Sequence, residues 1–226
     1  MFGTEGIQPS DAVQGGLGDC WIHAAAAAVA TDPRRIERLF EVTELNTAGV
    51  YAVNMYVMGI PVTVTVDDYL PMWSASERGL IYGGPSPDKS LWMPILEKAA
   101  AKFYGNYEML SGGWMGPAVQ ALTGAPYYDT NHADLSVDAL WNQIDKQLAD
   151  GWMMTAGSHT GTGSDRDSNA VGVAYRHAYT VLETKKDDSG TLFIKMRNPW
   201  GAETYVGPHS DDKNDGEWWT DAKTYH

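Results

Sequence analysis

The chain has 226 residues, 16 of them basic and 29 acidic, so its formal net charge is −13. This length suffices for one sizeable domain or two small ones, and a hydrophobic content of 43% argues against disorder. The acidity disfavours nucleic acid as a partner, because phosphate binding requires clustered Lys and Arg. No stretch approaches the ~18–20 apolar residues of a membrane span, so we expect no direct membrane insertion.

The first half of the chain is expected to be mainly helical. After an irregular lead-in, the alanine-rich run 20–30 predicts a helix with Asp19 as its N-cap, accepting hydrogen bonds from the first turn. A second, short helix is expected over 34–40. The alternation in 62–66 indicates a strand, which we expect to pair with 50–58 as a hairpin.

The character of the chain changes after residues 111–113. Before them, apolar residues at helical spacing over 91–103 predict a third helix. After them, we expect an amphipathic helix that is capped by Ser136 and stops at Gly151. Strand-like runs then occupy residues 152–156, 177–183 and 192–198.

These elements predict an α+β fold with two subdomains. Residues 1–111 would form a helical subdomain and residues 112–226 a β-rich one, with a glycine hinge between them. A cleft between two subdomains is the default place for a ligand and for chemistry.

Cys20 is the only cysteine, which excludes an intrachain disulfide and a zinc site built on several thiolates. Since no Asn-x-Ser/Thr acceptor occurs either, we expect an intracellular, cytoplasmic protein. A lone cysteine is more often an inert hydrophobe than a nucleophile. Here, however, it follows a glycine-rich run and begins a helix, whose N-terminus carries partial positive charge that stabilises a thiolate.

A catalytic thiolate also needs a proton acceptor, and that acceptor must be oriented by a third polar group. His177 and Asn198 lie in two strand-like runs, 21 residues apart, so a hairpin could place them side by side. The order Cys, His, Asn is the order found in papain-type proteases.

The run QGGLGDCW, from Gln14 to Trp21, resembles the nucleophile motif of the calpain family of cysteine proteases. Further similar motifs follow in the same order over nearly the whole chain, namely LEKAAAK (96–102), YEMLSGG (107–113), HAYTV (177–181), RNPWG (197–201) and DGEWW (215–219). The resemblance implies a papain-like protease core, with the active site in the cleft between a helical and a β-rich subdomain. The implied activity is that of an endopeptidase, and the implied partners are protein or peptide substrates and other domains of a longer chain.

The resemblance also assigns roles to individual residues. Cys20 would be the nucleophile, His177 the general base and acid, and Asn198 the group that orients the imidazole. Gln14 would donate a hydrogen bond in the oxyanion hole. The residues implied to line the substrate cleft are Gly112, Gly113 and Trp200.

Calpain cores carry two calcium sites, so the resemblance implies calcium as a cofactor that draws the two halves into register. For the first site, Asp11 and the carbonyl of Gly6 match the family, whereas Ser90 stands where an acidic ligand is expected and Asp88 lies two positions earlier. The ligands implied for the second site are Asp211, the Lys213 carbonyl, Asp215 and Glu217. A solvated acidic turn remains the alternative there, while an EF-hand is excluded because Ala222 occupies the position of its bidentate Glu.

Two other functions remain open. The first is a catalytically silent protein of the same fold that binds partners. This alternative stays open because Trp200 in this family can wedge between the halves of an inactive core. Transfer of acyl groups to amines would use similar Cys–His chemistry, but transglutaminases have Asp where Asn198 stands.

His23, one turn after Cys20, is expected to pack in the core, since the family motif has an apolar residue there.

Overall fold

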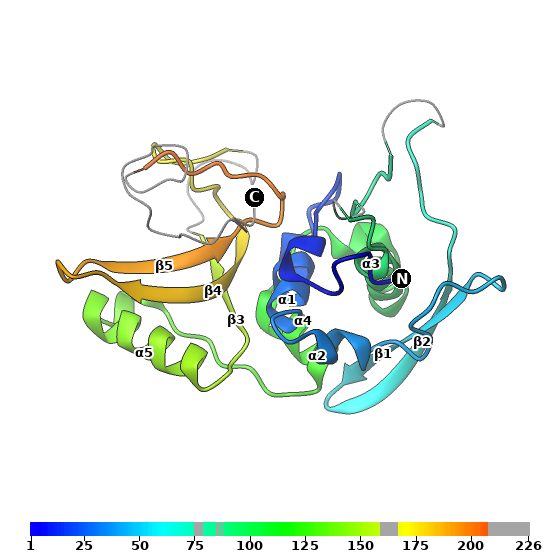
Figure 1. The fold of residues 1–226 in the computed structure, drawn as a ribbon, viewed down its shortest axis with the longest axis horizontal. Coiled ribbons are helices and arrows are strands. Elements are labelled where there is room, and N and C mark those ends of the chain that lie inside the picture. Colours follow the sequence, from blue (N-terminus) through cyan, green and yellow to red (C-terminus); the bar gives the residue numbers. More distant parts are fainter. Residues whose placement is uncertain (75–78, 85, 87, 159–166, 208–226) are drawn as a thin grey trace.

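A computed structural model of the chain describes residues 1–74, 79–84, 86, 88–158 and 167–207. A group of helices lies in the middle, with a small antiparallel sheet on either side (Figure 1). The fold is α+β, as predicted. In chain order the elements are η1 (Pro9–Asp11), α1 (Cys20–Val29), α2 (Pro33–Glu37), β1 (Val50–Val57), β2 (Ile60–Asp67), α3 (Trp92–Tyr104), η2 (Tyr107–Leu110), α4 (Met115–Thr123), η3 (His132–Asp134), α5 (Val137–Ala149), β3 (Met154–Gly157), β4 (Ala178–Lys186) and β5 (Leu192–Arg197).

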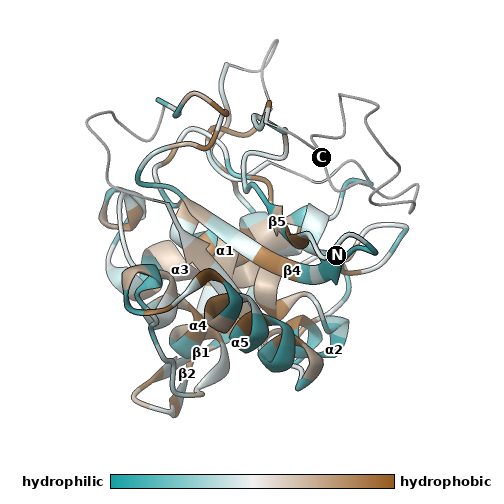
Figure 2. Cartoon of the chain, turned by 90° about the vertical axis from the view of Figure 1, so that its left-hand side faces the viewer, coloured by the Kyte–Doolittle hydropathy of each residue, from teal (hydrophilic) through white to brown (hydrophobic). Residues whose placement is uncertain are grey.

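The central helix α1 is buried along its whole length. Its five consecutive alanines make this possible, because a side chain of one methyl group lets neighbouring elements approach the helix from every side. Figure 2 shows α1 as predominantly hydrophobic and the outer side of α5 as largely hydrophilic. The core of the molecule is therefore centred on the helix that begins with Cys20.

The predicted hairpin is confirmed, with β1 and β2 paired antiparallel and Val53 opposite Val64. Alternate residues of β1 are buried, as expected for a strand with one face on a core. This face packs against α3 and α4.

Helix α4 was not predicted from the sequence. Gly116 and Pro117 lie in its first turn and obscure the helical pattern, although proline is compatible with the start of a helix. It ends at Gly124, whose φ of 71° is in the left-handed region. Because α4 packs on α1 and β1, the chain returns to the central helices directly after residues 111–113. The subdomain boundary at residue 111 stays a prediction.

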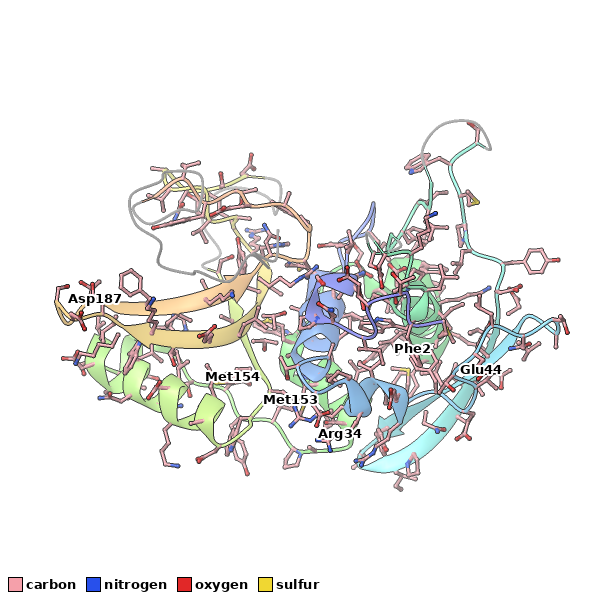
Figure 3. The ribbon with its side chains drawn as sticks, in the orientation of Figure 1. Phe2, Arg34, Glu44, Met153, Met154 and Asp187 are labelled. Atoms are coloured by element: carbon pink, nitrogen blue, oxygen red, sulfur yellow. The ribbon has the colours of Figure 1, made fainter. Side chains whose placement is uncertain are left out.

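The second sheet has the strand order β3-β4-β5, and α5 packs against β4. The predicted cap of α5 is confirmed, since the Ser136 hydroxyl accepts a hydrogen bond from the Ala139 amide at 3.2 Å. A second contact joins helix and sheet, because Trp141 Nε1 donates to the Phe193 carbonyl at 3.2 Å. Asp187 marks the end of this sheet that is remote from α1 (Figure 3).

The second sheet packs on α1 through β3 and β4, whereas the first sheet packs on α3 and α4, which in turn contact α1. Met153 and Met154 lie where the second sheet approaches α1 (Figure 3). A buried hydrogen bond fixes this contact, in which the Thr180 hydroxyl donates to the Ala24 carbonyl at 2.8 Å. Within the described residues, no helix has the length and apolar character that crossing a membrane requires.

Candidate active site

Cys20 is the first residue of α1 and is 8% exposed. The glycine-rich run before it is anchored at two points. The Gly16 amide donates to the Ile81 carbonyl, and the Gln14 amide donates to the Pro199 carbonyl, each at 2.8 Å. The second bond ties the segment ahead of Cys20 to the residue that follows Asn198. The thiol therefore lies at the positive end of a helix dipole, as the sequence indicated.

The role predicted for Asp19 is wrong. It occupies the N-cap position, but its side chain makes no capping hydrogen bond. Its carboxylate is fully buried and lies 3.4 Å from Nδ1 of His23, with Glu97 nearby. A carboxylate directed into the core cannot also reach the free amides of the first turn.

His177 and Asn198 come together at the same end of the second sheet. His177 precedes β4 and Asn198 follows β5, and the pairing of Thr180 with Arg197 places the two side by side. His177 Nε2 lies 2.8 Å from Asn198 Oδ1. The hairpin thus brings together the two residues that the sequence singled out.

Neighbouring groups determine how the Asn198 amide is oriented. Its Oδ1 accepts a hydrogen bond from the Trp200 backbone amide at 3.0 Å. Since Oδ1 is an acceptor, the His177 nitrogen that faces it must be the donor, so Nε2 carries a proton. The Trp200 ring covers the imidazole, with centroids 4.3 Å apart and planes at 38°.

Two further residues hold the imidazole in place, and the sequence analysis missed both. The Ser158 hydroxyl accepts from the His177 amide at 2.9 Å and donates to the His177 carbonyl at 3.2 Å. The Tyr179 ring meets the imidazole edge to face at a centroid distance of 5.0 Å. Burial raises the pKa of Tyr179, and the charge of Cys20 adds to this rise. Tyr179 was within reach of sequence analysis, because it lies two residues after His177 in a predicted strand.

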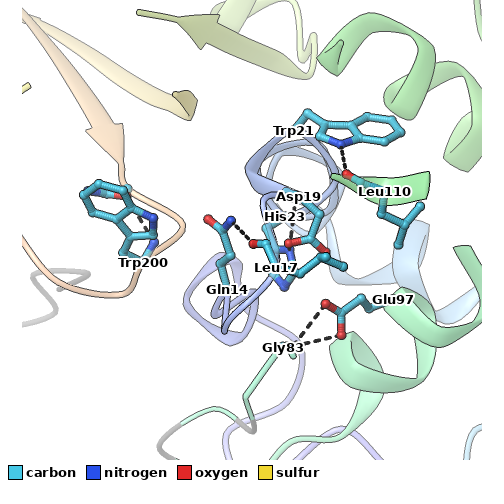
Figure 4. Close-up of polar contacts among 10 residues, drawn as sticks. Gln14, Leu17, Asp19, Trp21, His23, Gly83, Glu97, Leu110 and Trp200 are labelled. Carbon is cyan, nitrogen blue, oxygen red and sulfur yellow. Dashed lines mark hydrogen bonds and ion pairs between the residues drawn. The ribbon is translucent and has the colours of Figure 1, made fainter. Parts of the chain in front are cut away.

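Gln14 lies in the run before Cys20, but its amide is engaged within its own loop. Nε2 donates to the Leu17 carbonyl at 2.6 Å, while Oε1 is buried and has no hydrogen-bond partner among the described residues. Gln14 and Trp200 lie on facing segments in Figure 4. An amide NH2 has two donors, so one N–H remains for a further acceptor.

Gly112 and Gly113 lie beside the segment that carries the nucleophile. The Gly112 amide donates to the Gly18 carbonyl at 2.8 Å. A Cβ atom on Gly113 would stand 2.4 Å from Cε2 of Trp21, so only glycine fits against that ring. The structure therefore brings this glycine pair next to the start of α1.

The residues expected at the first calcium site lie near the N-terminus and before α3. Asp11 is buried, and its Oδ2 accepts hydrogen bonds from Trp92 Nε1 at 2.7 Å and from the Gln8 amide at 2.9 Å. Burial raises the pKa of Asp11, and the nearby Asp88 carboxylate adds to the rise. Ser90, where the family has an acidic ligand, is buried, and its hydroxyl faces the Met1 carbonyl.

Gly6 is exposed and has a φ of 77°. Asp88 contacts the same N-terminal segment, since its Oδ2 accepts a hydrogen bond from the Glu5 amide at 3.1 Å. Carboxylate and carbonyl oxygens are the ligands that calcium prefers. The ligands expected for the second site, Asp211, Lys213, Asp215 and Glu217, lie outside the described residues.

Arg197 links the first of these regions to the second sheet. It is 1% exposed, and one guanidinium NH2 donates to the Ser10 carbonyl at 3.1 Å. Burial lowers the pKa of Arg197 to about 10, and the Asp11 carboxylate opposes this. The residue before Asn198 therefore contacts the segment that carries Asp11.

Comparison with known proteins gives a consistent result. The model of the calpain family cysteine proteases matches residues 1–225. The calpain-type cysteine protease ADL1 of rice (Oryza sativa subsp. japonica) is 35% identical over 222 residues, which are 95% of this chain and 10% of that protein. The rat (Rattus norvegicus) calpain-1 catalytic subunit is 32% identical over 229 residues, covering 96% of this chain and 31% of that protein.

Mouse (Mus musculus) calpain-12 is 29% identical over 249 residues, covering all of this chain and 34% of that protein. The chain thus spans about a tenth to a third of the length of these relatives. Its helices and antiparallel sheets are those of a papain-like protease core. The chain belongs to the calpain family of cysteine proteases.

Proposed function

We propose that this chain is a cysteine endopeptidase that hydrolyses peptide bonds through Cys20, His177 and Asn198. The observation that carries the proposal is the 2.8 Å contact between His177 Nε2 and Asn198 Oδ1, at the end of a sheet that packs on the nucleophile helix. The substrate class is an extended segment of protein or peptide. The intracellular location expected from the sequence remains part of this proposal.

The hydrogen bonds around His177 favour one direction of proton transfer. Because Nε2–H donates to Asn198, Nδ1 is the nitrogen that takes the thiol proton of Cys20. The resulting thiolate attacks the carbonyl carbon of the scissile bond, and His177 returns the proton to the leaving amine. Water, activated by the same imidazole, then hydrolyses the thioester and restores the thiol.

Charge on the carbonyl oxygen must be stabilised as the thiolate attacks. The backbone amide of Cys20 is at a helix N-terminus, where amides lack intrahelical acceptors. Gln14 supplies the second donor, with the N–H of its amide that does not contact Leu17. The bond from the Gln14 amide to Pro199 holds this donor in register with the His177 side of the site.

The residues beside the nucleophile suit a peptide substrate in extended form. Gly112 and Gly113 present backbone next to the segment that carries Cys20, without side chains that would block an approaching strand. The Trp200 ring lies against the imidazole of His177 and would shield the His177–Asn198 pair from water. Selection among substrates is therefore expected to depend on side-chain contacts beyond this central part.

We further propose that calcium raises activity. In the described part of the chain, the residues that would hold it are Asp11 and Asp88 with the carbonyl of Gly6, at the segment that contacts Arg197. Arg197 directly precedes Asn198 and contacts Ser10, so a cation bound by Asp11 would lie near the contact that joins this segment to the second sheet. The test is direct, since equal hydrolysis rates in calcium and in chelator would contradict this part alone.

The central experiment uses the single thiol. Intact mass is followed while the chain reacts with a peptidyl epoxide, in calcium and in chelator, with denatured chain as the reference for intrinsic reactivity. Labelling far faster than the reference, at Cys20 and absent in His177→Ala, supports an activated nucleophile. Labelling no faster than the reference in either buffer contradicts the proposal and favours a catalytically silent binding module.

A peptide-hydrolysis assay completes the test, with Cys20→Ala as the control. Turnover that persists in Cys20→Ala would exclude the proposed nucleophile. Incorporation of a primary amine in place of hydrolysis would indicate an acyltransferase.

A further inference from the structure

Three ionisable side chains meet in the core behind the start of α1. Asp19 and His23 belong to this region of α1, and Glu97 reaches them from α3 (Figure 4). They are 0%, 0% and 1% exposed. Each offers one potential ligand atom, and these atoms all lie within 4.8 Å of one another. The proposed reaction uses none of the three.

This cluster contains too few hydrogen-bond donors for its acceptors. Both carboxylate oxygens of Asp19 and Nε2 of His23 are buried without a hydrogen-bond partner among the described residues. The two oxygens of Glu97 share a single donor, the Gly83 amide, at 3.1 and 2.9 Å. Asp19 Oδ1 also lies 3.4 Å from Nδ1 of His23. Buried polar atoms are nearly always paired, so the unpaired atoms indicate that the cluster takes up a proton or a cation.

The electrostatics of the cluster give the same indication. Burial raises the pKa of Glu97 to about 8, and the Asp19 carboxylate adds to this while His23 opposes it. For His23, burial favours the neutral ring, but Asp19 and Glu97 outweigh it and raise the pKa. Two carboxylates in a dry site therefore compete for positive charge.

Gly83 leaves space next to two of the unsatisfied groups. A Cβ atom at this position would stand 3.0 Å from both Nε2 of His23 and Oε2 of Glu97. Any other residue would therefore crowd the point where the imidazole and the carboxylate converge. The cluster thus has potential ligand atoms, buried polar atoms without hydrogen-bond partners, and space beside Gly83.

We propose that Asp19, His23 and Glu97 form a buried site for one divalent transition-metal ion of the zinc class. Zinc binds imidazole nitrogen and carboxylate oxygen at about 2.0–2.2 Å, which separates tetrahedral ligands by roughly 3.3 Å. The widest pair in the cluster would close by no more than about 1.5 Å. One imidazole nitrogen with two carboxylates favours zinc over calcium and magnesium, which prefer oxygen ligands alone.

An ion at this position would join three parts of the chain. Asp19 directly precedes Cys20, Glu97 lies on α3, and Gly83 belongs to the segment whose Ile81 carbonyl holds the glycine-rich run. Because the unfolded chain has no such preformed site, zinc would bind the folded state preferentially and raise its thermal stability.

The test separates this site from the thiol and imidazole of the cleft, which can also bind zinc. The full chain carrying both Cys20→Ser and His177→Ala is freed of metal with chelator. It is then equilibrated with Zn²⁺ until the bound amount no longer rises. We expect one zinc ion per chain by elemental analysis, a raised melting temperature, and no competition from excess Ca²⁺.

Variants in this background locate the ion. His23→Leu, which has similar size and no ligand atom, should weaken zinc binding at least 100-fold. Glu97→Gln keeps an acceptor for the Gly83 amide and should weaken binding at least tenfold, so it serves where His23→Leu fails to fold. His132→Ala, which alters an exposed histidine, is the matched control and should bind zinc unchanged.

Two results would overturn the proposal. The first is a background variant that folds and binds no zinc, which would mean that protons satisfy the cluster. The second is zinc binding that neither His23→Leu nor Glu97→Gln weakens, which would place the ion elsewhere. Cobalt provides an independent check, since Co²⁺ at this nitrogen–oxygen site should give visible ligand-field bands in the background variant, and His23→Leu should abolish them.

Discussion

His177 and His23 are both buried imidazoles, 2% and 0% exposed, and both belong to the neighbourhood of α1. Their partners differ in charge. Nε2 of His177 donates to the neutral amide of Asn198, whereas His23 lies between the carboxylates of Asp19 and Glu97. A neutral partner fixes the orientation of a ring without fixing its charge. Carboxylates instead favour either the protonated imidazole or a metal cation bound beside it.

The comparison explains why one histidine suits catalysis and the other does not. A general base must accept a proton and release it in every turnover, so strong stabilisation of either form slows one of the two steps. Asn198, Trp200 and Tyr179 surround His177 with an amide and two aromatic rings. His23 has the opposite environment, which suits a permanent charge or a metal ion.

The largest expected effect comes from removing His177. In His177→Ala, kcat/KM for a peptide substrate should fall by about 10⁴-fold or more, because the thiol loses its proton acceptor. Rates are normalised to folded chain by circular dichroism. His132→Ala should retain full activity, and a loss below tenfold in His177→Ala would show that this imidazole is not the base.

Asn198→Asp gives His177 the kind of partner that His23 has. The carboxylate stabilises the protonated imidazole, so the acid limb of the kcat/KM profile, where the imidazole must lose its proton to act as a base, should move to higher pH by about one unit or more. The measurement is a pH–rate profile in calcium, compared with Asn198→Ala. We expect Asn198→Ala to lower kcat/KM by about 10²-fold without this displacement, because it removes orientation but adds no charge. An unmoved profile in Asn198→Asp would contradict the pairing.

The carboxylates around His23 predict how stability depends on pH in metal-free chain. The pKa of Glu97 is about 8 in the folded state against 4.5 as its ordinary value. Between these values the folded state binds a proton that the unfolded state has released, so the free energy of unfolding falls as pH rises. The raised pKa of His23 acts in the same direction above its ordinary value of 6.5.

Thermal melts from pH 5 to pH 8 in chelator should therefore show a falling melting temperature. Glu97→Gln should reduce the slope, because it removes one of the two groups. Zinc should oppose the fall, since metal binding displaces protons and strengthens as pH rises. A wild-type slope no steeper than that of Glu97→Gln would mean that Glu97 is ionised in the fold.

The smallest effect concerns the hydrogen bond between Thr180 of β4 and Ala24 of α1, which joins the strand after His177 to the helix that contains His23. Thr180→Val removes the hydroxyl that donates to Ala24, which should cost about 1 kcal/mol and lower the melting temperature by roughly 2–4 °C. We also expect kcat/KM to fall severalfold, because Thr180 holds the His177 strand against α1. Thr184→Val removes a hydrogen bond to Asp145 at α5 and should leave kcat/KM unchanged. Equal kinetic effects in both variants would contradict a positioning role for Thr180.

Patterns of neighbouring residues predicted much of this molecule correctly. The β1–β2 hairpin, the start of α1 and the Ser136 cap depend on alternation, alanine content and one short side chain, so the sequence contains all the information they need. Helix α4 escaped because Gly116 and Pro117 hide its pattern, and its formation depends on packing against α1 and β1. Sequence motifs singled out Cys20, His177 and Asn198, while Ser158 carried no such signal.

The sequence by itself determined that a cysteine begins an alanine-rich helix and that His177 and Asn198 lie in two strand-like runs that can pair as a hairpin. Local hydrogen bonding and hydrophobic periodicity are sufficient for both. Tertiary structure alone decided that the Asp19 side chain turns away from the free amides of the first turn, towards His23 and Glu97. The physical reason is that this orientation depends on Glu97 of α3 and on Gly83, which are distant from Asp19 in the chain. The charge of Glu97 and the space beside Gly83 reach Asp19 and His23 only after the core has packed.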